Sequence, residues 1–597
     1  EEYIHILEGG GTFTIDGQEV VVAPGTPIIK AAAEIGKAIP HFCYHPGLTV
    51  VGQCRMCFVE IEGAPKLATA CSTAPMEGQK VHTASEKVKA GQNGTLEFTL
   101  LHHPLDCPIC DRGGECKLQD YTYEYGPPHS RMEDEKKLHD KHRHISEQIV
   151  LDQERCILCT RCVRFSSEVD GRAEIVVQGR GTENVVDVFE GRPFSSNYSG
   201  NVVDLCPVGA LTAQDFRFQA RPWELKKHEG LCTGCSTGCN IEIHTKQRHH
   251  GIPRPDKSLP RPEIERLVPR ENLQVNQWWM CDKGRWGYHF HNRDEQKLHE
   301  PLLREGGALR NASLKEIQAL LESQKGNWEF WVDDAVPHEG IAWAKELAQS
   351  WGARGRQLRG LNPSDFGQRV LTAWAARTAS PWFAGVSDWS TVKTVVATVD
   401  ARTLENIVPM LALKLGQPFR HGRLQWKVRA SDALFDATDD AGSTAYLVPS
   451  PKNEADLANL AKIPATAKAL LLWTGFNARG LLNEGLAPIE AVGASLRGQT
   501  PQGPVFYFGQ TNQNPKNLGL VEYLKKAPFL VVADSFVSEV SQAAAIVLPL
   551  QPLYESRLTA TSLENHRQTV KGIELRHPNL HELDRGGELV SASLKLL

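Results

Sequence analysis

Fifteen cysteines and one nearby histidine fall into groups whose spacing is typical of metal binding. All the cysteines lie between Cys43 and Cys281. The groups, which we call the first, second, third and fourth sets, are Cys43, Cys54, Cys57 and Cys71; His103, Cys107, Cys110 and Cys116; Cys156, Cys159, Cys162 and Cys206; and Cys232, Cys235, Cys239 and Cys281. Thiolate sulfur donates well to iron, and a cluster needs ligands from several directions. Four groups of four, with no cysteine left over, predict four iron-sulfur sites.

The third set has the most specific spacing. Three cysteines at two-residue gaps are followed by a remote cysteine next to proline, Cys206-Pro207, which is the bacterial ferredoxin pattern for a 4Fe-4S cluster. Structural zinc also takes sulfur ligands at C-x2-C spacing, but usually as two separated pairs. Disulfides are a weaker alternative, because the chain shows no signal peptide and such spacing in a reducing compartment more often binds metal.

The second set has three cysteines, so its fourth ligand must be another residue. His103, four residues before Cys107, would complete the set. A lone histidine in a loop is more often a surface residue, and the neighbouring His102 fits the spacing as well. Spacing alone leaves both histidines as candidates.

The elements expected around the first set are those of a small ferredoxin domain. Two alternating segments about Asp16-Gly17 predict a hairpin over 11–25. A helix over 28–35 should follow, and a strand over 58–61 should leave the cysteine loop. This is the order of a plant-type 2Fe-2S ferredoxin, although the first cysteine gap is ten residues here rather than four.

Three other segments carry weaker signals. The charged run over 131–144 has no apolar period and predicts a solvated segment rather than a binding patch. The stretch 202–211 should provide the return cysteine of the third set and the start of a helix. A polar, proline-rich excursion over 244–269 interrupts the fourth set, and its His249 and His250 are expected to face water.

The composition is that of a large soluble protein. At 597 residues and 41% hydrophobic content the chain has room for several domains. A net charge of -5 with mixed signs gives no nucleic-acid footprint, and no apolar run is long enough to span a membrane. The chain begins at Glu1 rather than methionine, which is compatible with trimming. No G-x-G-x-x-G follows a strand and no Walker A motif occurs, so no dinucleotide or triphosphate site is indicated.

The last part of the chain should form an α/β domain. Apolar segments over 394–399, 470–473, 505–508 and 529–533 alternate with helical patterns. This alternation predicts α/β units on a largely parallel sheet.

With these sets, and with Cys206-Pro-Val-Gly-Ala-Leu211, the chain resembles the large iron-sulfur subunits of respiratory complex I, the G subunits of bacterial NADH-quinone oxidoreductases, over essentially its whole length. The resemblance implies His103 rather than His102 as the histidine ligand. It also implies one 2Fe-2S cluster in the first set and a 4Fe-4S cluster in each of the others. The fold implied is an α+β N-terminal part, with 2Fe-2S ferredoxin-like (β-grasp) and 4Fe-4S ferredoxin-like modules, followed by an α/β molybdopterin-oxidoreductase-like domain.

The expected domains follow the sets. They are 1–80, a 2Fe-2S ferredoxin-type domain; 81–144, a 4Fe-4S segment with one histidine and three cysteine ligands; 145–225, a 4Fe-4S ferredoxin-like domain; 226–290, the fourth 4Fe-4S module; and 291–597, a degenerate molybdopterin oxidoreductase-like domain.

The segment 279–288 is similar to the beginning of a molybdopterin oxidoreductase domain. Lys283, two residues after Cys281, stands where active relatives such as formate dehydrogenases have a cofactor-binding lysine between cluster and pterin. The segments 538–549, 554–555 and 563–568 resemble the stretch that approaches the pterin. No cysteine follows Cys281 to bind molybdenum, and complex I subunits carry this domain as an inactive relic. Molybdopterin is therefore expected to be absent and the domain to be a scaffold.

The function implied is that of an electron-conducting subunit of NADH:quinone oxidoreductase, a translocase, with no catalytic residues or NADH and quinone sites of its own. Electrons would pass from an NADH-oxidising FMN flavoprotein towards quinone, coupled to proton translocation, with the fourth cluster off the path. The implied partners are that flavoprotein, a thioredoxin-like 2Fe-2S subunit and the downstream iron-sulfur and quinone-site subunits, with no nucleic acid. The implied location is the peripheral arm, on the cytoplasmic side of the inner membrane.

Three other functions fit parts of the pattern. The large subunit of an NAD-linked molybdenum formate dehydrogenase shares the N-terminal half and would contain molybdenum. An iron-only hydrogenase shares the first three sets but needs further cysteines that are missing here. A zinc scaffold would be colourless.

Overall fold

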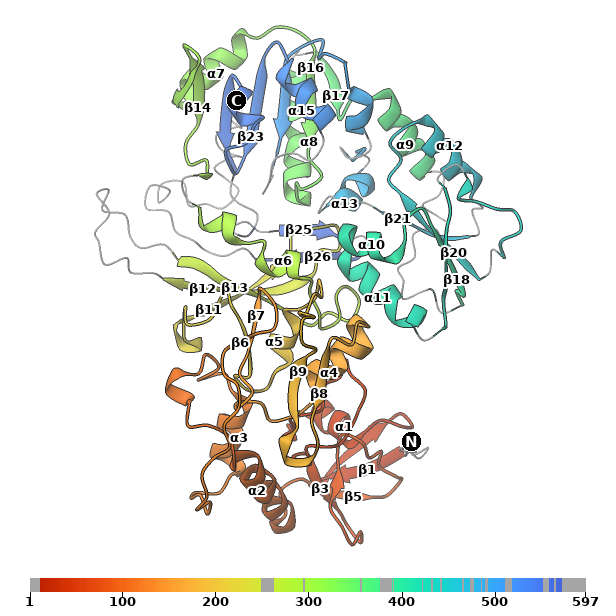
Figure 1. Cartoon of the computed structure of the whole chain (residues 1–597). Coiled ribbons are helices and arrows are strands. Elements are labelled where there is room, and N and C mark those ends of the chain that lie inside the picture. Colours follow the sequence, from red (N-terminus) through yellow and green to blue (C-terminus); the bar gives the residue numbers. More distant parts are fainter. Residues whose placement is uncertain are drawn as a thin grey trace. The chain divides into compact units, whose positions relative to one another are not determined.

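The computed structural model divides into two compact units, Glu1–Leu225 and Lys226–Leu597, which are drawn from red to yellow and from yellow to blue in Figure 1. The residues that the structure describes are 11–247 and 262–571, with gaps in the second range at 294–295, 355–356, 376–388, 390, 421, 431–432, 441–442, 464–466, 473–476, 485, 489–491, 510–517, 551–553, 555–557 and 563–564.

The first unit opens with a small mixed sheet built on a tight hairpin. In its described residues five strands pair in the order β2-β1-β5-β3-β4, with β1 and β5 parallel. Asp16 and Gly17, between β1 and β2, both have positive φ, 49° and 82°, as a type I′ hairpin turn requires. The predicted hairpin and the strand predicted at 58–61 are confirmed. The strands are β1 Gly11–Ile15, β2 Gln18–Val22, β3 Phe58–Ile61, β4 Ala68–Thr69 and β5 Lys80–His82.

The helix predicted over 28–35 is α1, Ile28–Glu34. It packs on a core that includes Phe13 and Val81 from the sheet and Cys57 and Cys71 from the first set. The same apolar core therefore holds the sheet together and positions two predicted ligands. The buried side chains of α1 are Ile28, Ile29, Ala31 and Ala32.

The rest of the first unit consists of short elements around the second and third sets. A three-stranded antiparallel sheet, β10-β7-β6, and a hairpin, β8-β9, lie among its described residues. The strands are β6 Arg143–His144, β7 Ile149–Leu151, β8 Ile175–Gln178, β9 Val185–Val188 and β10 Leu211–Ala213. The helices are α2 Glu86–Leu100, η1 Cys107–Ile109, α3 Lys117–Tyr125, α4 Arg161–Arg164, η2 Phe165–Asp170, η3 Gly181–Glu183, α5 Asn201–Leu205 and η4 Pro222–Glu224.

Two expectations for the first unit need correction. The helix expected to start within 202–211 is instead α5, which ends at Leu205, and β10 follows. Cys206 has extended backbone angles, φ -68° and ψ 118°, because the ring of Pro207 disfavours helical angles in the preceding residue.

The charged run over 131–144 is solvated only in part. Lys136 donates to the carbonyl oxygens of Leu100 and Leu101, at 3.0 and 2.8 Å, and so binds the chain just before His103. Lys141 pairs with Asp106 at 2.7 Å. The run therefore packs against the loop of the second set.

The second unit opens with a three-stranded antiparallel sheet beside the fourth set. Its strands are β11 Lys226–Leu231, β12 Asn240–Gln247 and β13 Pro262–Pro269. The excursion expected over 244–269 thus begins and ends in paired strands, and His249 and His250 lie outside the described residues. Two short helices, α6 Asp282–Trp286 and η5 His289–Asn292, follow Cys281.

The α/β part has two sheets rather than the one that was predicted. Among its described residues, seven strands pair in the order β15-β14-β24-β23-β22-β16-β17 and four in the order β19-β18-β20-β21. Pairing is parallel except at β14 and β15. The seven are β14 Leu302–Glu305, β15 Ala308–Asn311, β16 Trp328–Val332, β17 Leu358–Leu361, β22 Val505–Phe508, β23 Leu530–Asp534 and β24 Ile546–Pro549. The four are β18 Thr394–Ala397, β19 Gln425–Val428, β20 Thr444–Pro449 and β21 Lys468–Leu472.

All four predicted strands occur, as β18, β21, β22 and β23, and Trp473 lies outside the described residues. Strand β16 is buried along its whole length, because α8 packs on Phe330 from one face and α15 on Trp331 from the other. Figure 1 shows α8 and α15 beside this sheet. None of the described helices is long and apolar enough to cross a bilayer.

The remaining elements of the second unit are helices and a small antiparallel ribbon, β25-β26. They are α7 Leu314–Ser323, α8 His338–Ala353, α9 Asp365–Ala375, α10 Ala401–Ile407, α11 Pro409–Arg420, α12 Glu454–Lys462, α13 Ala478–Asn483, η10 Gly493–Leu496, α15 Leu518–Lys525, η11 Ser541–Ala543, β25 Leu558–Thr561 and β26 Arg567–Val570.

Candidate functional site: four cysteine sets

The first set is brought together by the loop between α1 and β3 and by the turn after β4. The backbone N–H of Cys43 donates to Sγ of Cys54 at 3.4 Å. The thiols of Cys43 and Cys54 form one hydrogen-bonded pair and those of Cys57 and Cys71 another. The hydrogen bond from Cys43, against the opposing effect of burial, lowers the pKa of Cys54 well below its ordinary value. The structure therefore places the four predicted sulfurs in two neighbouring pairs, whose charges act on each other.

The second set combines two buried sulfurs with one at the surface. Cys110 and Cys116 are buried and Cys107 is exposed. Burial raises the pKa of the Cys116 thiol to about 11. A protein interior of this kind disfavours free thiolates, so a positive partner such as iron would be needed to keep the sulfurs charged.

The two candidate histidines of the second set differ in exposure. His102 is exposed and accepts a hydrogen bond at Nδ1 from the backbone N–H of Lys137, whereas His103 is half-buried. Burial, together with the positive charges of Lys136 and Arg155, lowers the pKa of His103 to about 4. The His103 ring is thus neutral at pH 7, which is the form that binds metal.

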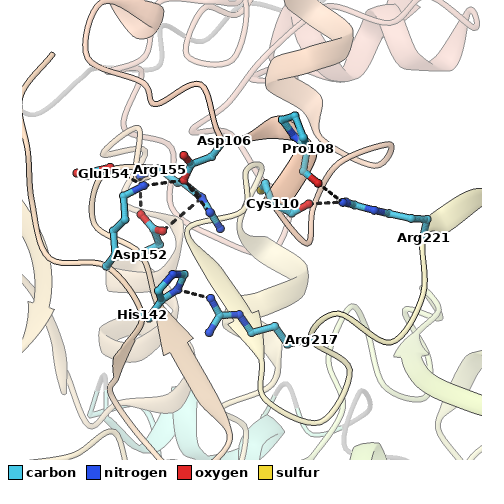
Figure 2. A network of polar contacts seen from close by, with 10 residues as sticks. Asp106, Pro108, Cys110, His142, Asp152, Glu154, Arg155, Arg217 and Arg221 are labelled. Carbon is cyan, nitrogen blue, oxygen red and sulfur yellow. Dashed lines mark hydrogen bonds and ion pairs between the residues drawn. The ribbon is translucent and has the colours of Figure 1, made fainter. Parts of the chain in front are cut away.

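A partly buried ion-pair network joins the loop of the second set to that of the third (Figure 2). Arg155 donates from Nε and Nη2 to Asp106 Oδ2, at 2.8 and 2.7 Å, and Lys141 donates to the same oxygen. Burial raises the pKa of Asp106, but the hydrogen bonds from Lys141 and Arg155 outweigh it and lower the pKa. Asp106 directly precedes Cys107 and Arg155 directly precedes Cys156. The pair therefore fixes the two cysteine loops to each other.

A second group of contacts holds the loop of the second set against the segments at Cys206 and Arg221. Arg221 donates to the carbonyl oxygens of Cys110 and Pro108, both at 2.6 Å, as Figure 2 shows. Arg112 donates to the carbonyl oxygen of Cys206 at 2.7 Å. Gly209 leaves no space for a side chain, because a Cβ there would lie 2.1 Å from Sγ of Cys110. The backbone after Cys206 therefore lies directly against a sulfur of the second set.

The third set surrounds a single cavity. Leu158 and Thr160, within the C-x2-C-x2-C run, have positive φ values of 52° and 58°, so the loop turns sharply enough to direct its sulfurs inward. Burial raises the pKa of the Cys159 thiol to about 11. The cavity is lined by the four cysteines of the set together with Leu151, Ile157, Thr160, Arg161, Val186, Val208, Ala210 and Leu211.

The fourth set is buried throughout. The backbone N–H of Gly284 donates to Sγ of Cys281 at 3.4 Å. A Cβ at Gly284 would lie 2.8 Å from Sγ of Cys232, so α6 approaches the set as closely as a backbone can. Burial raises the pKa of the Cys232 thiol to about 12, and the exposed Lys283 lies near enough to oppose that shift.

The segments that were expected to approach a pterin contact the fourth set. Tyr554 is buried and hydrogen-bonds Thr233, next to Cys232, while Glu555 lies outside the described residues. Gln568 donates from Nε2 to the carbonyl oxygen of Gly238, next to Cys239, at 2.9 Å. Of the other predicted stretches, 538–549 forms η11 and β24, and 563–564 lie outside the described residues.

The chemistry of these groups fits iron-sulfur clusters. All 15 cysteines lie in the described residues, and none forms a disulfide. Each set combines sulfur donors with a close approach of the backbone or a cavity of its own, and thiolate sulfur is the ligand that iron-sulfur clusters take. Within the described residues, no three His, Cys, Asp or Glu side chains converge as they would around one metal ion.

The residues that sequence reasoning missed lie beside the ligands. They are Asp106, Arg155, Arg161, Arg164, Gly209 and Gly284. Their only sequence signal was position, because each lies within three residues of a predicted ligand.

Four protein-family models match the chain, in the order of the sets. They are a 2Fe-2S iron-sulfur cluster binding domain over 12–86, the NADH-ubiquinone oxidoreductase-G iron-sulfur binding region over 92–131, the NADH-quinone oxidoreductase subunit 3 ferredoxin-like domain over 146–212 and the molybdopterin oxidoreductase Fe4S4 domain over 225–293. They confirm 2Fe-2S and 4Fe-4S binding domains and a molybdopterin-type Fe4S4 domain in a mixed α/β chain.

Curated relatives share about two fifths of the aligned residues. The NADH-ubiquinone oxidoreductase 75 kDa subunit of Reclinomonas americana is 38% identical over 356 residues, which is 58% of this chain and 49% of that protein. The NADH-quinone oxidoreductase G subunit of Streptomyces coelicolor is 40% identical over 321 residues, 52% of this chain and 36% of that protein. The corresponding protein of Rickettsia bellii is 39% identical over 313 residues, 52% of this chain and 44% of that protein.

The chain thus spans about half the length of these relatives or less. Among solved structures, a chain of an NAD+-reducing [NiFe]-hydrogenase in the H2-reduced state matches with 30% identity and a TM-score of 0.33, covering 35% of this chain and 90% of that one. The matches to the curated relatives confirm the resemblance that the four cysteine sets indicated.

Proposed function

We propose that this chain, a relative of the G subunits of NADH-quinone oxidoreductases, is the electron-conducting iron-sulfur subunit of a complex I. Electrons would pass from a partner flavoprotein that oxidises NADH at FMN towards a partner with a quinone site, coupled to proton translocation. The observation that supports this proposal is the spacing of the 15 cysteines in four sets, three of which are linked by hydrogen bonds within one unit. The sequence has no dinucleotide or triphosphate motif.

The ligands proposed are the sixteen that sequence spacing and resemblance indicate. The first set would hold a 2Fe-2S cluster on a β-grasp-type sheet, and the other sets would each hold a 4Fe-4S cluster. His103 is proposed as the only non-cysteine ligand, and its burial compared with His102 supports this choice.

When bound, the clusters supply one-electron transfer between sites of fixed potential. The protein itself excludes water, fixes the spacing of the sites and places charges beside them. Arg155 and Asp106 fix the loops of the second and third sets to each other, and Gly209 lets these loops touch. Lys283 adds a positive charge beside the fourth set, where active relatives are expected to bind a pterin.

The domain limits proposed are those expected from the sequence, 1–80, 81–144, 145–225, 226–290 and 291–597. The last domain would be a scaffold without molybdopterin. The partners proposed are the FMN flavoprotein, a thioredoxin-like 2Fe-2S subunit and the iron-sulfur and quinone-site subunits downstream. The proposed place is the peripheral arm, on the cytoplasmic side of the membrane.

Metal analysis tests the proposal directly. The isolated chain, reconstituted without oxygen, should bind about 14 irons, from one 2Fe-2S and three 4Fe-4S centres, with matching sulfide. Stoichiometric zinc with little iron would show that the sites are structural and refute the proposal. Stoichiometric molybdenum in the native complex would instead favour a formate dehydrogenase.

A further inference from the structure

Two arginines from one helical turn lie buried in the first unit, beside both the first and the third set. Arg161 and Arg164 are the ends of α4, Arg161–Arg164, and are 5% and 6% exposed. Cys162 lies between them in sequence. The turn that carries a ligand of the third set therefore also carries two cations.

Each guanidinium binds main-chain carbonyls of two loops. Arg161 donates from Nη1 to Leu205, next to Cys206, at 3.2 Å, and from Nη2 to Tyr44, next to Cys43. The two cations thus connect the loop that begins at Cys43 with the loops of the third set. The carbonyls that receive hydrogen bonds from Arg164 are those of Cys43, Thr49 and Cys159.

Among the described residues, neither side chain is paired directly with a carboxylate, although Glu168 accepts a hydrogen bond from the backbone N–H of Thr49, whose carbonyl oxygen binds Arg164. In the described part of the chain, no ion pair joins either guanidinium to an aspartate or glutamate, and Arg161 Nε is buried without a hydrogen-bond partner. A buried cation with no anion nearby is strongly unfavourable. Carbonyl dipoles compensate only part of that charge, so a further anion beside the two guanidinium groups would stabilise them.

The cysteine sets are where that anion would be. Arg161 lines the same cavity as the four cysteines of the third set. Arg164 is tied through its Nη2 to the main chain of a first-set ligand. Four thiolates around iron and sulfide leave a cluster with net negative charge, and one-electron reduction makes that charge more negative.

We propose that Arg161 and Arg164 are the counter-cations of the first and third iron-sulfur centres and raise the reduction potentials of both. This inference rests on the proposed function, because it requires clusters in those sets. Reduction adds one electron and one negative charge to a centre, and a fixed buried cation stabilises the reduced form. Arginine stays protonated at any working pH, so the effect does not depend on pH.

The test is a redox titration of the intact complex, in which low-temperature electron paramagnetic resonance measures the reduction of each centre. Arg161→Gln should lower the equilibrium constant for reduction of the third centre about tenfold or more. This corresponds to a reduction potential lower by about 59 mV for one electron. Arg164→Gln should lower the reduction potential of the first centre as well as that of the third. Arg161→Lys and Arg164→Lys keep the charge and should restore most of the potential. The fourth centre should not change in any of these variants.

Arg131→Gln is the matched control. Arg131 pairs with Glu97 in the same unit, but its side chain is 82% exposed, so its removal should leave every centre unchanged. Unchanged potentials in both Gln variants with all iron retained would overturn the proposal. The proposal would also be overturned if the Lys and Gln variants lowered the reduction potentials equally, because hydrogen-bond geometry and not charge would then matter.

Loss of iron in the variants can also be interpreted. If Gln variants lose only the first and third centres while Lys variants keep them, the charge is needed to hold the clusters and the proposal stands. If Lys variants lose all four centres, the arginines are structural and it fails. Absence of iron from the unmutated protein would instead refute the proposed function, so the two failures are distinguishable.

Discussion

Two glycines show how closely the backbone approaches sulfur in this protein. A Cβ at Gly209 would lie 2.1 Å from Sγ of Cys110, and one at Gly284 would lie 2.8 Å from Sγ of Cys232. Neither belongs to the described glycines with a positive φ, so space and not backbone conformation requires them. Each glycine lets the backbone of one segment contact the sulfur of a predicted ligand in a different segment.

Gly209→Ala should therefore damage the second set. The new methyl would force Cys110 or the loop after Cys206 to move, at a cost of about 1–3 kcal/mol of folding free energy. The second centre should broaden or disappear in paramagnetic resonance spectra. Gly94→Ala is the control, because Gly94 lies in α2 with nothing within 4 Å of its Cβ position, and alanine there should stabilise the helix by up to about 1 kcal/mol. If Gly209→Ala and Gly94→Ala gave the same paramagnetic resonance spectra, the close contact between Gly209 and Sγ of Cys110 would be contradicted.

The choice between His102 and His103 can also be tested. His103→Ala should perturb one centre, whereas His102→Ala should leave all signals in place. Imidazole is neutral where thiolate is anionic, so a centre with one histidine is easier to reduce, as in Rieske centres. His103→Cys should then lower the potential of that centre. Unchanged spectra in both His103 variants would refute the assignment.

Residue types and spacing predict the ligand sets but give no sign of the charged side chains around them. The partners in the Asp106–Arg155 pair are 49 residues apart, and nothing in either neighbourhood points to the other. The contacts of Arg161 and Arg164 with the loop at Cys43 are formed across more than 100 residues, 117 and 121. Such pairs follow from tertiary structure, so no local pattern could have indicated them.

Secondary structure was predictable where the residues typical of a turn and the spacing of the apolar residues indicate the same element. The hairpin at Asp16-Gly17 has both signals and is confirmed. The prediction that a helix starts within 202–211 was wrong, because α5 ends at Leu205. Apolar residues on both sides of Cys206 were compatible with a helix, but the ring of Pro207 disfavours helical angles at Cys206.

Helix α7 has a capping box that predicts a pH dependence. Glu316 accepts hydrogen bonds from the backbone N–H and from Oγ of Ser313, both at 2.8 Å. The bond from the backbone of Ser313, then that from its hydroxyl, then that from Arg310 lower the pKa of Glu316 to about 2 from its ordinary 4.5. The stabilisation is complete above pH 4.5 and is lost as the pH falls from 4.5 to about 2.

The comparison of wild type with Glu316→Gln at matched pH isolates this effect. Hydrogen exchange of α7 peptides should differ between the two proteins by a constant factor above pH 5 and converge below it. Ser313→Ala should destabilise the start of α7 by about 1 kcal/mol at neutral pH. Ser85, which caps α2 with Val88 at the third position, provides the control: Ser85→Ala should leave the exchange of α7 unchanged. A difference that grows as the pH falls would contradict the capping box.

At the scale of the whole molecule, the α/β class was predictable and the number of sheets was not. Continuous apolar runs such as Val505–Phe508 are typical of strands covered on both faces. Which strands share a sheet depends on crossovers between segments far apart in sequence. For example, β16 pairs with β22 across more than 150 residues of chain.

The fourth set closes a long loop at the beginning of the second unit. Cys239 and Cys281 are separated by β12, β13 and the segment between them. A cluster that binds only the folded state adds its binding free energy to folding. Cys281→Ala should therefore loosen the start of α6 and reduce the yield of assembled complex severalfold. If the fourth centre is off the electron path, complexes that do assemble should keep their NADH-to-quinone turnover per flavin.

Turnover normalised to flavin must be measured with the yield of intact complex. Cys110→Ala, in a set proposed to lie on the path, is the control and should lower the turnover itself. Normal yield with collapsed turnover in Cys281→Ala would mean that the fourth centre carries current. It would also favour a working pterin beside Lys283.

The exposure of Cys107 has a chemical consequence. It is the exposed cysteine of the protein, while all the others are buried or half-buried. Alkylating reagents and oxidants reach an exposed sulfur first. Iodoacetamide added briefly to iron-free chain should modify Cys107 well before Cys110, as mass spectrometry of the peptides would show. Equal labelling of the two would contradict the exposure difference. Damage by air should therefore begin at the second set and spread to the buried sets later, which makes that set the first to fail in storage.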